Sequence, residues 1–422
     1  MHLAQRAYIL IVLTAVLAIT GIWSSHPGFE GLWRIPAALL LLGLAWESAV
    51  VRRIPISVAI ETAPHAFLGR AQPAAFAFRN DSSRAVAMEY APVLPDGFAP
   101  LWETRRVLAP ARGTGRDSFL LLPIKLGAQP PRPVSSRLRG PLGLAWWSRD
   151  LQPSGQLSIA PDTSSRGTAR PRGYPSGPRS RRAVGAGAEL YQLRGYRAGD
   201  PMTRIDWKAT ARARRLVTRE FSEDQHLDIL IAIDAGRFSR VRVGSLDRFG
   251  LYANAAARFA ELATANDDRI GLMVFTDRPL FSSAPARGLA GVMRVRRALE
   301  AMQPEPAESD PTAAAVRIRS ILKRRGLVIL LTHLDDVNSA DPLAKAVRLL
   351  SPPHFVVVAE AREAREWSDP WVALAAQEHE ARVALQRLLL RQLGTSVVVA
   401  PPESLDRALL AEYEALRRSR AV

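Results

Sequence analysis

The stretch LDILIAID, residues 227–234, decides the fold of the C-terminal half of this chain. Apolar residues from Leu227 to Ile233 are interrupted only by Asp228, which is typical of a strand buried on both faces of a sheet. A carboxylate, Asp234, follows directly. Buried strands of this kind belong to parallel sheets that helices cover on both sides. The stretch therefore predicts an α/β domain that begins at this point.

Similar apolar runs and helical segments alternate through the rest of the chain. We expect strands at 270–275, 327–332, 355–359 and 396–400, and helices at 246–265, 289–302, 312–325, 361–393 and 404–417. This alternation predicts a parallel, doubly wound sheet over residues 227–422. Binding sites in such sheets lie at the carboxyl ends of the strands. Asp234, Asp277 and Thr332-His333 are the polar residues expected there.

The preceding segment, residues 54–161, has a different periodicity. Apolar and polar residues alternate through Ile54, Ile56, Val58 and Ile60, and again around Phe76 and Phe78. Turn sequences such as Arg79-Asn80-Asp81-Ser82 separate these short runs. Alternation at hairpin spacing predicts an antiparallel β-sandwich without an evident catalytic motif.

Residues 1–53 contain two apolar runs that predict a transmembrane helical hairpin. The first runs from Ala7 to Trp23, seventeen residues without a charge. The second lies between Leu32 and Val51. Ser24-Ser25-His26 is a poor cleavage site, and a second apolar run follows closely, so we expect an anchor rather than a cleaved signal peptide.

Basic residues lie mainly at the two outer ends of this predicted hairpin, with Arg34 near the start of the second run. Arg6 precedes the first run and Arg52-Arg53 follow the second, whereas residues 24–31 contain no Lys or Arg. The positive-inside rule then predicts that both termini and the large soluble part face the cytoplasm, on the inner membrane. The chain has no Cys, which agrees with a reducing compartment and excludes thiolate metal sites.

Within residues 162–226, the stretch from Arg166 to Arg219 carries most of the formal net charge of +17. Between Arg166 and Arg219 there are 14 Lys or Arg against 3 acidic residues, a net charge of +11. The first part of this segment, to Ala188, is rich in Pro, Gly, Ser and Arg and predicts an exposed connector. A solvated loop is one interpretation of this charge. An anionic partner is the other, with acidic lipid as the nearest candidate and nucleic acid the second.

The end of this basic segment holds the densest motif of the chain, GAELYQLRGYRAGDPMTRIDWKATARARRLVTREF, residues 187–221. Arg197-Ala198-Gly199-Asp200-Pro201 predicts a turn, and residues 205–215 can begin a short helix. We expect the basic side chains to pair with Glu189, Asp200 and Asp206, so that the segment clamps the α/β domain to its neighbour. The residues expected in this clamp or contact surface are Arg194, Tyr196, Gly199, Asp200, Arg204, Asp206, Trp207, Lys208 and Arg212.

This segment closely resembles the signature of the membrane-anchored family of unknown function numbered fifty-eight. The shared pattern is G-x-E, then L-R-x-Y-x-x-G-D-x-x-R-x-I-D-W-K-x-x-A-R, then L-x-x-R-E-F, and this chain departs from it at Gly195, where an acidic residue is common. Upstream, residues 140–144 are similar to the family's D-P-F-G-L turn, with Gly140 for the Asp. The resemblance implies two N-terminal spans, a β-rich middle, a von Willebrand A-like C-terminal domain and a MoxR-type AAA+ ATPase as partner.

A von Willebrand A-type domain holds Mg²⁺ with D-x-S-x-S, a Thr from a second loop and a later Asp. The corresponding positions here are Asp234, Gly236 and Phe238, then Thr312 and His333. Two hydroxyls are missing and an imidazole replaces a carboxylate, whereas Mg²⁺ requires oxygen ligands in octahedral geometry. We therefore expect Asp234, Thr312 and His333 to form a degenerate site without metal.

These observations predict a non-enzymatic membrane adaptor or scaffold that works with a MoxR-type ATPase in assembling or remodelling envelope or metalloenzyme complexes. No P-loop, dinucleotide-binding, G-x-S-x-G or H-E-x-x-H motif is present in the sequence. One alternative is a metal-dependent hydrolase using Asp234 and Asp277. Another is a protein that binds nucleic acid or anionic lipid through the basic connector. We expect no nucleic-acid partner and no cofactor.

Overall fold

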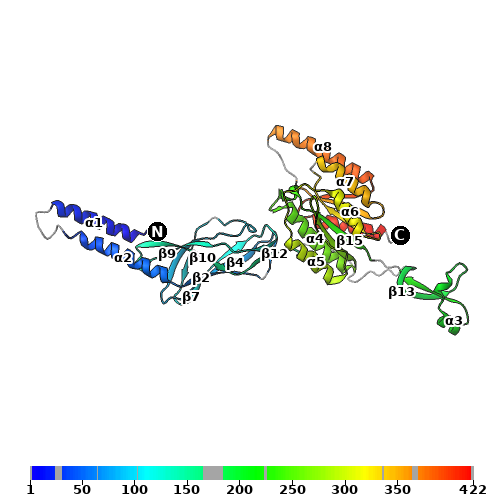
Figure 1. Ribbon diagram of the computed structural model, residues 1–422, viewed down its shortest axis with the longest axis horizontal. Coiled ribbons are helices and arrows are strands. Elements are labelled where there is room, and N and C mark those ends of the chain that lie inside the picture. Colours follow the sequence, from blue (N-terminus) through cyan, green and yellow to red (C-terminus); the bar gives the residue numbers. More distant parts are fainter. Residues whose placement is uncertain are drawn as a thin grey trace. The chain divides into compact units, whose positions relative to one another are not determined.

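The computed structural model describes residues 2–23, 31–63, 65–101, 103–164, 184–222, 226–334, 337–363 and 369–419. The chain divides into two compact units, Met1–Asp162 with Leu299–Met302, and Thr163–Ala298 with Gln303–Val422. Each is described by itself (Figure 1). Most of the predicted connector, residues 165–183, lies outside the described residues. Asp335 and Asp336, which follow His333 closely in the sequence, lie outside them as well.

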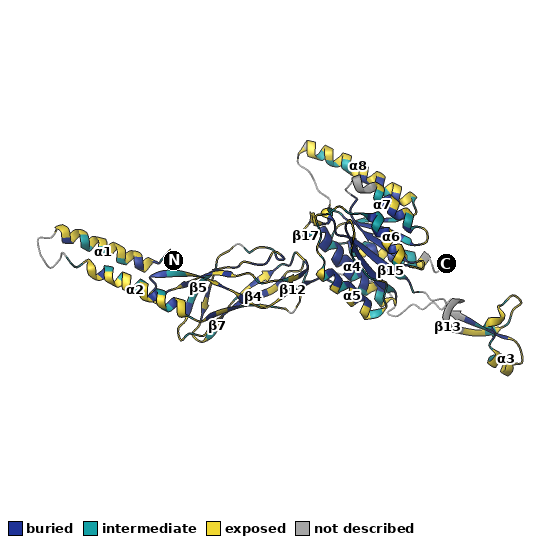
Figure 2. Cartoon of the chain, viewed as in Figure 1, coloured by how far each residue is buried: buried dark blue, intermediate teal, exposed yellow. Residues whose placement is uncertain are grey.

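Two long apolar helices, α1 (Gln5–Trp23) and α2 (Arg34–Arg53), begin the first unit. Both are long and apolar enough to cross a membrane, and α1 packs against α2. Most of their large apolar side chains are exposed (Figure 2). Exposed apolar helices are unfavourable in water and favourable in lipid. These two candidate spans are where the apolar runs predicted them.

The rest of the first unit is built from short strands in three sheets, with orders β1-β10-β9-β5-β6, β11-β2-β4-β7 and β3-β12-β8. The strands are β1 (His2–Leu3), β2 (Ile56–Thr62), β3 (Ala66–Phe67), β4 (Gln72–Asn80), β5 (Val86–Ala91), β6 (Arg105–Ala109), β7 (Gly113–Leu121), β8 (Gly127–Gln129), β9 (Val134–Arg139), β10 (Ala145–Leu151), β11 (Pro153–Ser154) and β12 (Leu157–Ala160).

Aromatic side chains join the first two of these sheets. The rings of Phe76 and Phe78 on β4 lie 5.6 and 4.8 Å from that of Tyr90 on β5, and all three side chains are buried. Alternating inward residues build this core, as the period-two pattern predicted. The prediction of purely antiparallel pairing is wrong at two places, because β11 pairs with β2, and β12 with β3, in parallel. Both exceptions involve two-residue strands, which are too short to leave a periodic signal.

A buried carboxylate ties α2 to the β-rich part. Glu47 accepts hydrogen bonds from the backbone N–H groups of Leu144 (3.2 Å) and Ala145 (3.1 Å), in the turn between β9 and β10. A Cβ atom on Gly140 would lie 2.2 Å from this carboxyl group. Glu47 therefore occupies the space that a side chain at position 140 would need. Arg149 adds a hydrogen bond of 2.7 Å to the carbonyl of Ile54, just after α2.

The second unit contains a six-stranded sheet of order β19-β18-β15-β20-β21-β22. Its strands are β15 (Asp228–Asp234), β18 (Arg269–Phe275), β19 (Pro279–Ser282), β20 (Leu327–Leu331), β21 (Phe355–Ala361) and β22 (Ser396–Ala400), and its helices are α4 (Arg248–Ala265), α5 (Gly288–Ala301), α6 (Pro311–Ile321), α7 (Val337–Leu350), α8 (Pro370–Gln392) and α9 (Leu405–Ser419). Two 3₁₀ turns, η1 (Met202–Arg204) and η2 (Arg237–Arg240), and the small pair β16 (Arg242–Val243) and β17 (Leu246–Asp247) complete the regular structure with β13, β14 and α3, described below.

This sheet confirms the mixed α/β architecture, with three differences. The edge strand β19 is antiparallel to β18, so the sheet is not purely parallel. Helix α7 was not expected, and the helix expected at 361–393 spans Pro370–Gln392, while β21 continues to Ala361. Strand order reverses between β15 and β20: the chain passes from β15 to β18 on one side and later to β20 on the other. Ligand crevices in open α/β sheets form outside such a reversal.

Candidate functional site

The signature segment, residues 184–222, folds as a strand pair with an insertion. Strand β13 (Val184–Gly195) pairs antiparallel with β14 (Val217–Ser222). Between them lie a turn, η1 and the short helix α3 (Trp207–Ala213). Gly199 has φ +105 in this turn, a left-handed conformation that favours glycine. The helix is shorter than the 205–215 expected, because Asp206 caps its start and Arg214 leaves it in the αL conformation.

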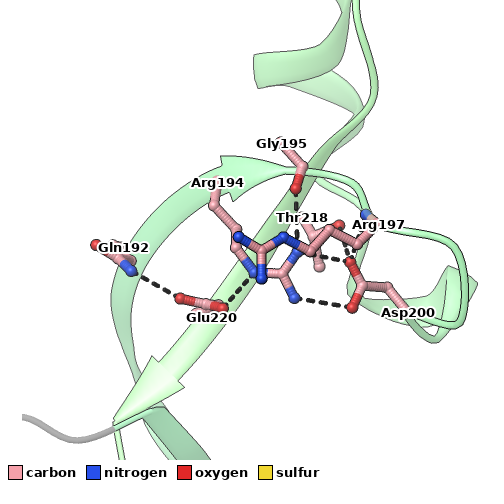
Figure 3. Close-up of polar contacts among 7 residues, drawn as sticks. All are labelled: Gln192, Arg194, Gly195, Arg197, Asp200, Thr218 and Glu220. Carbon is pink, nitrogen blue, oxygen red and sulfur yellow. Dashed lines mark hydrogen bonds and ion pairs between the residues drawn. The ribbon is translucent and has the colours of Figure 1, made fainter.

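Arg194 is the centre of a polar network at the end of this strand pair that adjoins the connecting turn (Figure 3). Its Nη1 and Nη2 atoms each donate to Asp200, at 2.8 Å, in a bidentate pair. Its Nε donates to Glu220, whose second oxygen accepts from Gln192 at 2.8 Å. Asp200 also accepts from the backbone N–H of Arg197 at 2.9 Å, which closes the turn. A bidentate guanidinium pair fixes orientation as well as charge, so the network sets the shape of the segment.

The same contacts shift the acidities of the network. Hydrogen bonds from Arg194, and then from the Arg197 backbone, lower the pKa of Asp200 to about 2. The Gln192 and Arg194 hydrogen bonds lower the pKa of Glu220, and the Asp200 and Glu220 bonds raise the pKa of Arg194. All three groups are therefore held in their charged forms at neutral pH. None of them is poised to transfer a proton there.

The expected clamp residues Asp206 and Trp207 lie in this segment differently from the prediction. Asp206 accepts a 2.9 Å hydrogen bond from the backbone N–H of Ala209 as the cap of α3, and the Arg219 guanidinium lies 4.0 Å away. Trp207 is 65% exposed and is not packed within this segment. Its position explains this: Trp207 is the first residue of a short helix whose neighbours Lys208 and Ala211 are also exposed.

The remaining signature residues divide into backbone-bound and exposed groups. Tyr196 is half-buried, and its N–H donates to the Leu216 carbonyl at 2.9 Å. Arg204 is half-buried in η1, whereas Lys208 and Arg212 are exposed. These three cations form no ion pair with another described side chain, contrary to the pairing we expected. Arg194 pairs with Asp200 and with the unpredicted Glu220 instead, and the side chain of Glu189 lies outside the described residues.

A second polar cluster lies at the carboxyl ends of β15 and β20, where the strand order reverses. Asp234 is buried, and its Oδ1 accepts from Ser309 and from the Gly236 N–H (2.9 Å). Its Oδ2 accepts from Thr332 (2.8 Å) and lies 3.4 Å from His333 Nδ1. Burial alone raises the pKa of Asp234, but His333, Ser309 and the Gly236 N–H together hold it below the usual range.

The residues around Asp234 do not fit a Mg²⁺ site of the expected kind. Each carboxylate oxygen already accepts from donor groups that a cation would displace. A Cβ atom on Gly236 would lie 2.1 Å from Ser309 Oγ, so the Ser309 hydroxyl fills the space of a side chain at 236. The ring of Phe238 lies 4.5 Å from that of His333 and closes another side. Among the described residues, no group of three or more His, Cys, Asp or Glu side chains is placed to hold a metal.

Two other residues expected near Asp234 do not contact it. Thr312 donates to the Pro342 carbonyl at 3.2 Å, because it lies in the first turn of α6 and faces α7. Asp277 is exposed and binds Arg278 at 3.1 Å. Ser309 takes the place we assigned to Thr312. The sequence Ser309-Asp310-Pro311-Thr312 offers two hydroxyls, at Ser309 and Thr312. Choosing between them requires knowing where α6 begins, which is set by Asp310 accepting from the Thr312 and Ala313 N–H groups.

Comparison with known proteins places part of the chain in a family. An uncharacterized protein of Mycobacterium tuberculosis and one of Mycobacterium bovis are each 26% identical over 186 residues, 43% of this chain and 57% of the relative. The chain thus spans just over half the length of these curated relatives.

Solved structures with partial likeness include the conserved hypothetical protein BatB from Bacteroides thetaiotaomicron. It is 11% identical, with a TM-score of 0.30, over 44% of this chain and 99% of that protein. Proximal thread matrix protein 1 of the mussel byssus is 12% identical, with a TM-score of 0.31, over 44% and 45%. Residues 192–392 match the model of the family described as Protein of unknown function DUF58, from β13 to the end of α8. This chain therefore carries a DUF58 domain, as the signature predicted.

Proposed function

We propose that this protein is a non-enzymatic adaptor or scaffold anchored in the inner membrane by α1 and α2, with its soluble units in the cytoplasm. The β-rich part serves as a spacer, and the α/β domain is a von Willebrand A-like interaction domain. The exposed apolar surface of the two helices and the position of Arg6, Arg52 and Arg53 support this anchoring. The Asp234 cluster at the strand-order reversal supports the domain type.

The signature segment carries the proposal. Its ionised groups Arg194, Asp200 and Glu220 bind one another and fix a turn, which suits a structural role. The segment also keeps exposed a set of groups that a purely structural element does not need. Trp207 begins α3, and Lys208 and Arg212, four residues apart, lie on one side of that helix.

Exposed tryptophan beside cations is the composition of a protein-binding surface. Tryptophan and arginine are enriched among the residues that dominate binding energy. Lys208, Arg212, Arg214 and Arg215 are all exposed, so the complementary surface carries acidic residues. The resemblance to the family supplies the partner we propose, a MoxR-type AAA+ ATPase. The protein would recruit this ATPase to the membrane for assembling or remodelling envelope or metalloenzyme complexes.

The experiment is co-purification of the full chain with a MoxR-type ATPase in mild detergent, with and without ATP. Trp207→Ala should reduce the recovered ATPase at least tenfold, the effect of about 1.4 kcal/mol or more at a binding hot spot. Trp371→Ala is the matched control, because Trp371 is 79% exposed on α8, outside the signature segment. Equal recovery with both variants would reject the signature surface as the docking site.

The two alternatives predict different results. A metal-dependent hydrolase would be stabilised by a divalent cation, and the donors already bound to Asp234 oppose this. A nucleic-acid-binding protein, tested as a lipid-free preparation with a nucleic-acid duplex, would show an affinity that falls steeply as the salt concentration rises. Anchoring is tested separately by a reporter after Val422: activity of a periplasmic reporter there would contradict the cytoplasmic assignment.

A further inference from the structure

A cavity of about 740 Å³ lies in the first unit, beside the end of α2. Four segments surround it: the start of α1, the last turns of α2, the loop between β4 and β5, and the turn between β9 and β10. The Glu47 contacts described above hold α2 against the β9–β10 turn, and Ala4 N donates to Leu144 O at 2.8 Å. The walls of the cavity are therefore fixed by hydrogen bonds between separate elements.

Cations converge on this cavity from all four segments. Arg6, Arg53, Arg84 and Arg139 line it, together with Ser82 and Ser83, and its lining contains no Asp or Glu. All four arginines are exposed rather than buried, and none forms an ion pair with another described residue. Arg6 donates to the Leu142 carbonyl at 2.8 Å, which aims it at the turn. The guanidinium of Arg139 lies beside Gly143, where a Cβ atom would be 3.3 Å from its Nη2.

The other part of the lining is apolar and belongs to the candidate span. Trp46 and Val50 are on α2, two and one turns before its end at Arg53. Leu108, on β6, contributes a further apolar side chain. A tryptophan near the end of a span is typical of the level of lipid headgroups. The cavity thus combines a cationic wall with an apolar wall at the level where the headgroup of a lipid meets its acyl chains.

We propose that this cavity binds a phosphate group, supplied by the headgroup of an anionic phospholipid. Guanidinium groups pair well with phosphate oxygens, and the Ser83 hydroxyl can donate to a remaining one, whereas Ser82 Oγ already donates to Asn80 Oδ1 at 2.7 Å. Basic pockets at the cytoplasmic side of transmembrane helices bind anionic headgroups by this chemistry. The apolar wall favours a lipid over free phosphate. The inference rests on the proposed anchoring, and binding would fix the angle at which α2 meets the β-rich part.

The test uses the full chain in a neutral detergent. Short-chain phosphatidylglycerol, short-chain phosphatidylcholine, glycerol 3-phosphate and inorganic phosphate are each titrated, and binding is followed by calorimetry and by the melting temperature. The double variant Arg84→Gln and Arg139→Gln removes two cavity cations. The control double variant Arg116→Gln and Arg132→Gln removes two exposed arginines that pair with Glu61 and Asp96, outside the lining.

We expect saturable binding of phosphatidylglycerol, weaker or absent binding of phosphatidylcholine, and a loss of affinity of about tenfold or more in the cavity variant only. Equal binding of inorganic phosphate, with the same dependence on Arg84 and Arg139, would support the phosphate site and identify a soluble source. Absence of binding by all four probes, or equal losses in the two double variants, would overturn the proposal. Anchoring is judged independently, by membrane extraction of the same variants.

Discussion

The signature network and the Asp234 cluster both surround a carboxylate with donors, but they differ in solvent access. The Asp200 side chain is 16% exposed and that of Asp234 is 1% exposed. Water screens the charges of the signature network and can replace a lost partner. This network therefore fixes the shape of the segment but contributes little to the free energy of unfolding. Water cannot replace a partner of Asp234, so each missing contact there leaves a buried polar group unsatisfied. Similar polar groups thus shape a surface in one region and hold together a core in the other.

The proposed docking surface lies in the solvated region. A segment whose ion pairs are satisfied among its own residues can present side chains outward without depending on a neighbouring domain. The buried cluster joins the ends of β15 and β20 and uses its donors to do so. Four substitutions or additions test whether the two regions differ in this way.

The largest effect is expected at Asp234. Asp234→Ala removes the acceptor of Gly236, Ser309 and Thr332, and should lower the free energy of unfolding by about 3–5 kcal/mol. Urea unfolding of the detergent-solubilised chain measures this. Asp277→Ala, at an exposed carboxylate of the neighbouring strand end, is the control and should cost about 1 kcal/mol or less. Equal losses in the two variants would contradict a structural role for the cluster.

An intermediate effect is expected at Asp206. Asp206→Ala removes the side-chain cap of α3 and should cost about 0.5–2 kcal/mol locally. Amide hydrogen exchange of residues 207–213 should accelerate, while exchange in β15 and β20 stays unchanged. Acceleration in those strands as well would support the interdomain clamp that the sequence suggested.

A smaller effect concerns acid stability. The pKa of folded Asp200 is about 2, below its usual 3.8, so its contribution to stability is present above 3.8 and is lost as the pH falls toward 2. Arg194→Gln removes the principal cause. NMR titration of the Asp200 carboxyl carbon should show its pKa rising toward 3.8 in this variant. A pKa that stays near 2 would assign the shift to the Arg197 backbone instead.

The smallest effect is expected from divalent cations. Millimolar Mg²⁺ or Mn²⁺ should leave the melting temperature of the chain unchanged, because Gly236 and Phe238 offer no side-chain oxygen and Ser309 already binds Asp234. A cation that binds the folded state raises this temperature by mass action. A saturable rise that Asp234→Ala abolishes would show that a metal displaces the Ser309 and Thr332 hydroxyls.

Most elements of the α/β domain were predictable because their signals are local. Buried strands such as β15 and β20 are short apolar runs whose limits the sequence marks within a residue or two. Helix α7 was missed because Asn338, Ser339, Asp341 and Pro342 favour a turn. Its second half is held by packing, with Leu343, Val347 and Leu350 buried at helical spacing. Strand β19 begins with a proline at a sheet edge and pairs only through tertiary contact.

The candidate site was predictable in composition but not in pairing. The signature identified Arg194 and Asp200, yet Glu220 was assigned to the following motif and not to the network. Its role depends on the register of β13 with β14, where Gln192 lies opposite Glu220. The sequence named Trp207 for the clamp or contact surface and left its exposure open. Helix α3 has only one or two turns, and its first residue, Trp207, is exposed.

The most direct test of this account is the solvent access of Trp207 in the full chain, measured by oxidative footprinting with and without a MoxR-type ATPase. Trp371 in the same sample is the internal standard. We expect both tryptophans to be oxidised readily in the isolated chain and the ATPase to protect Trp207 alone. Protection of Trp207 in the isolated chain would restore the buried clamp, and equal oxidation of Trp207 with and without the ATPase would contradict its place in the docking surface.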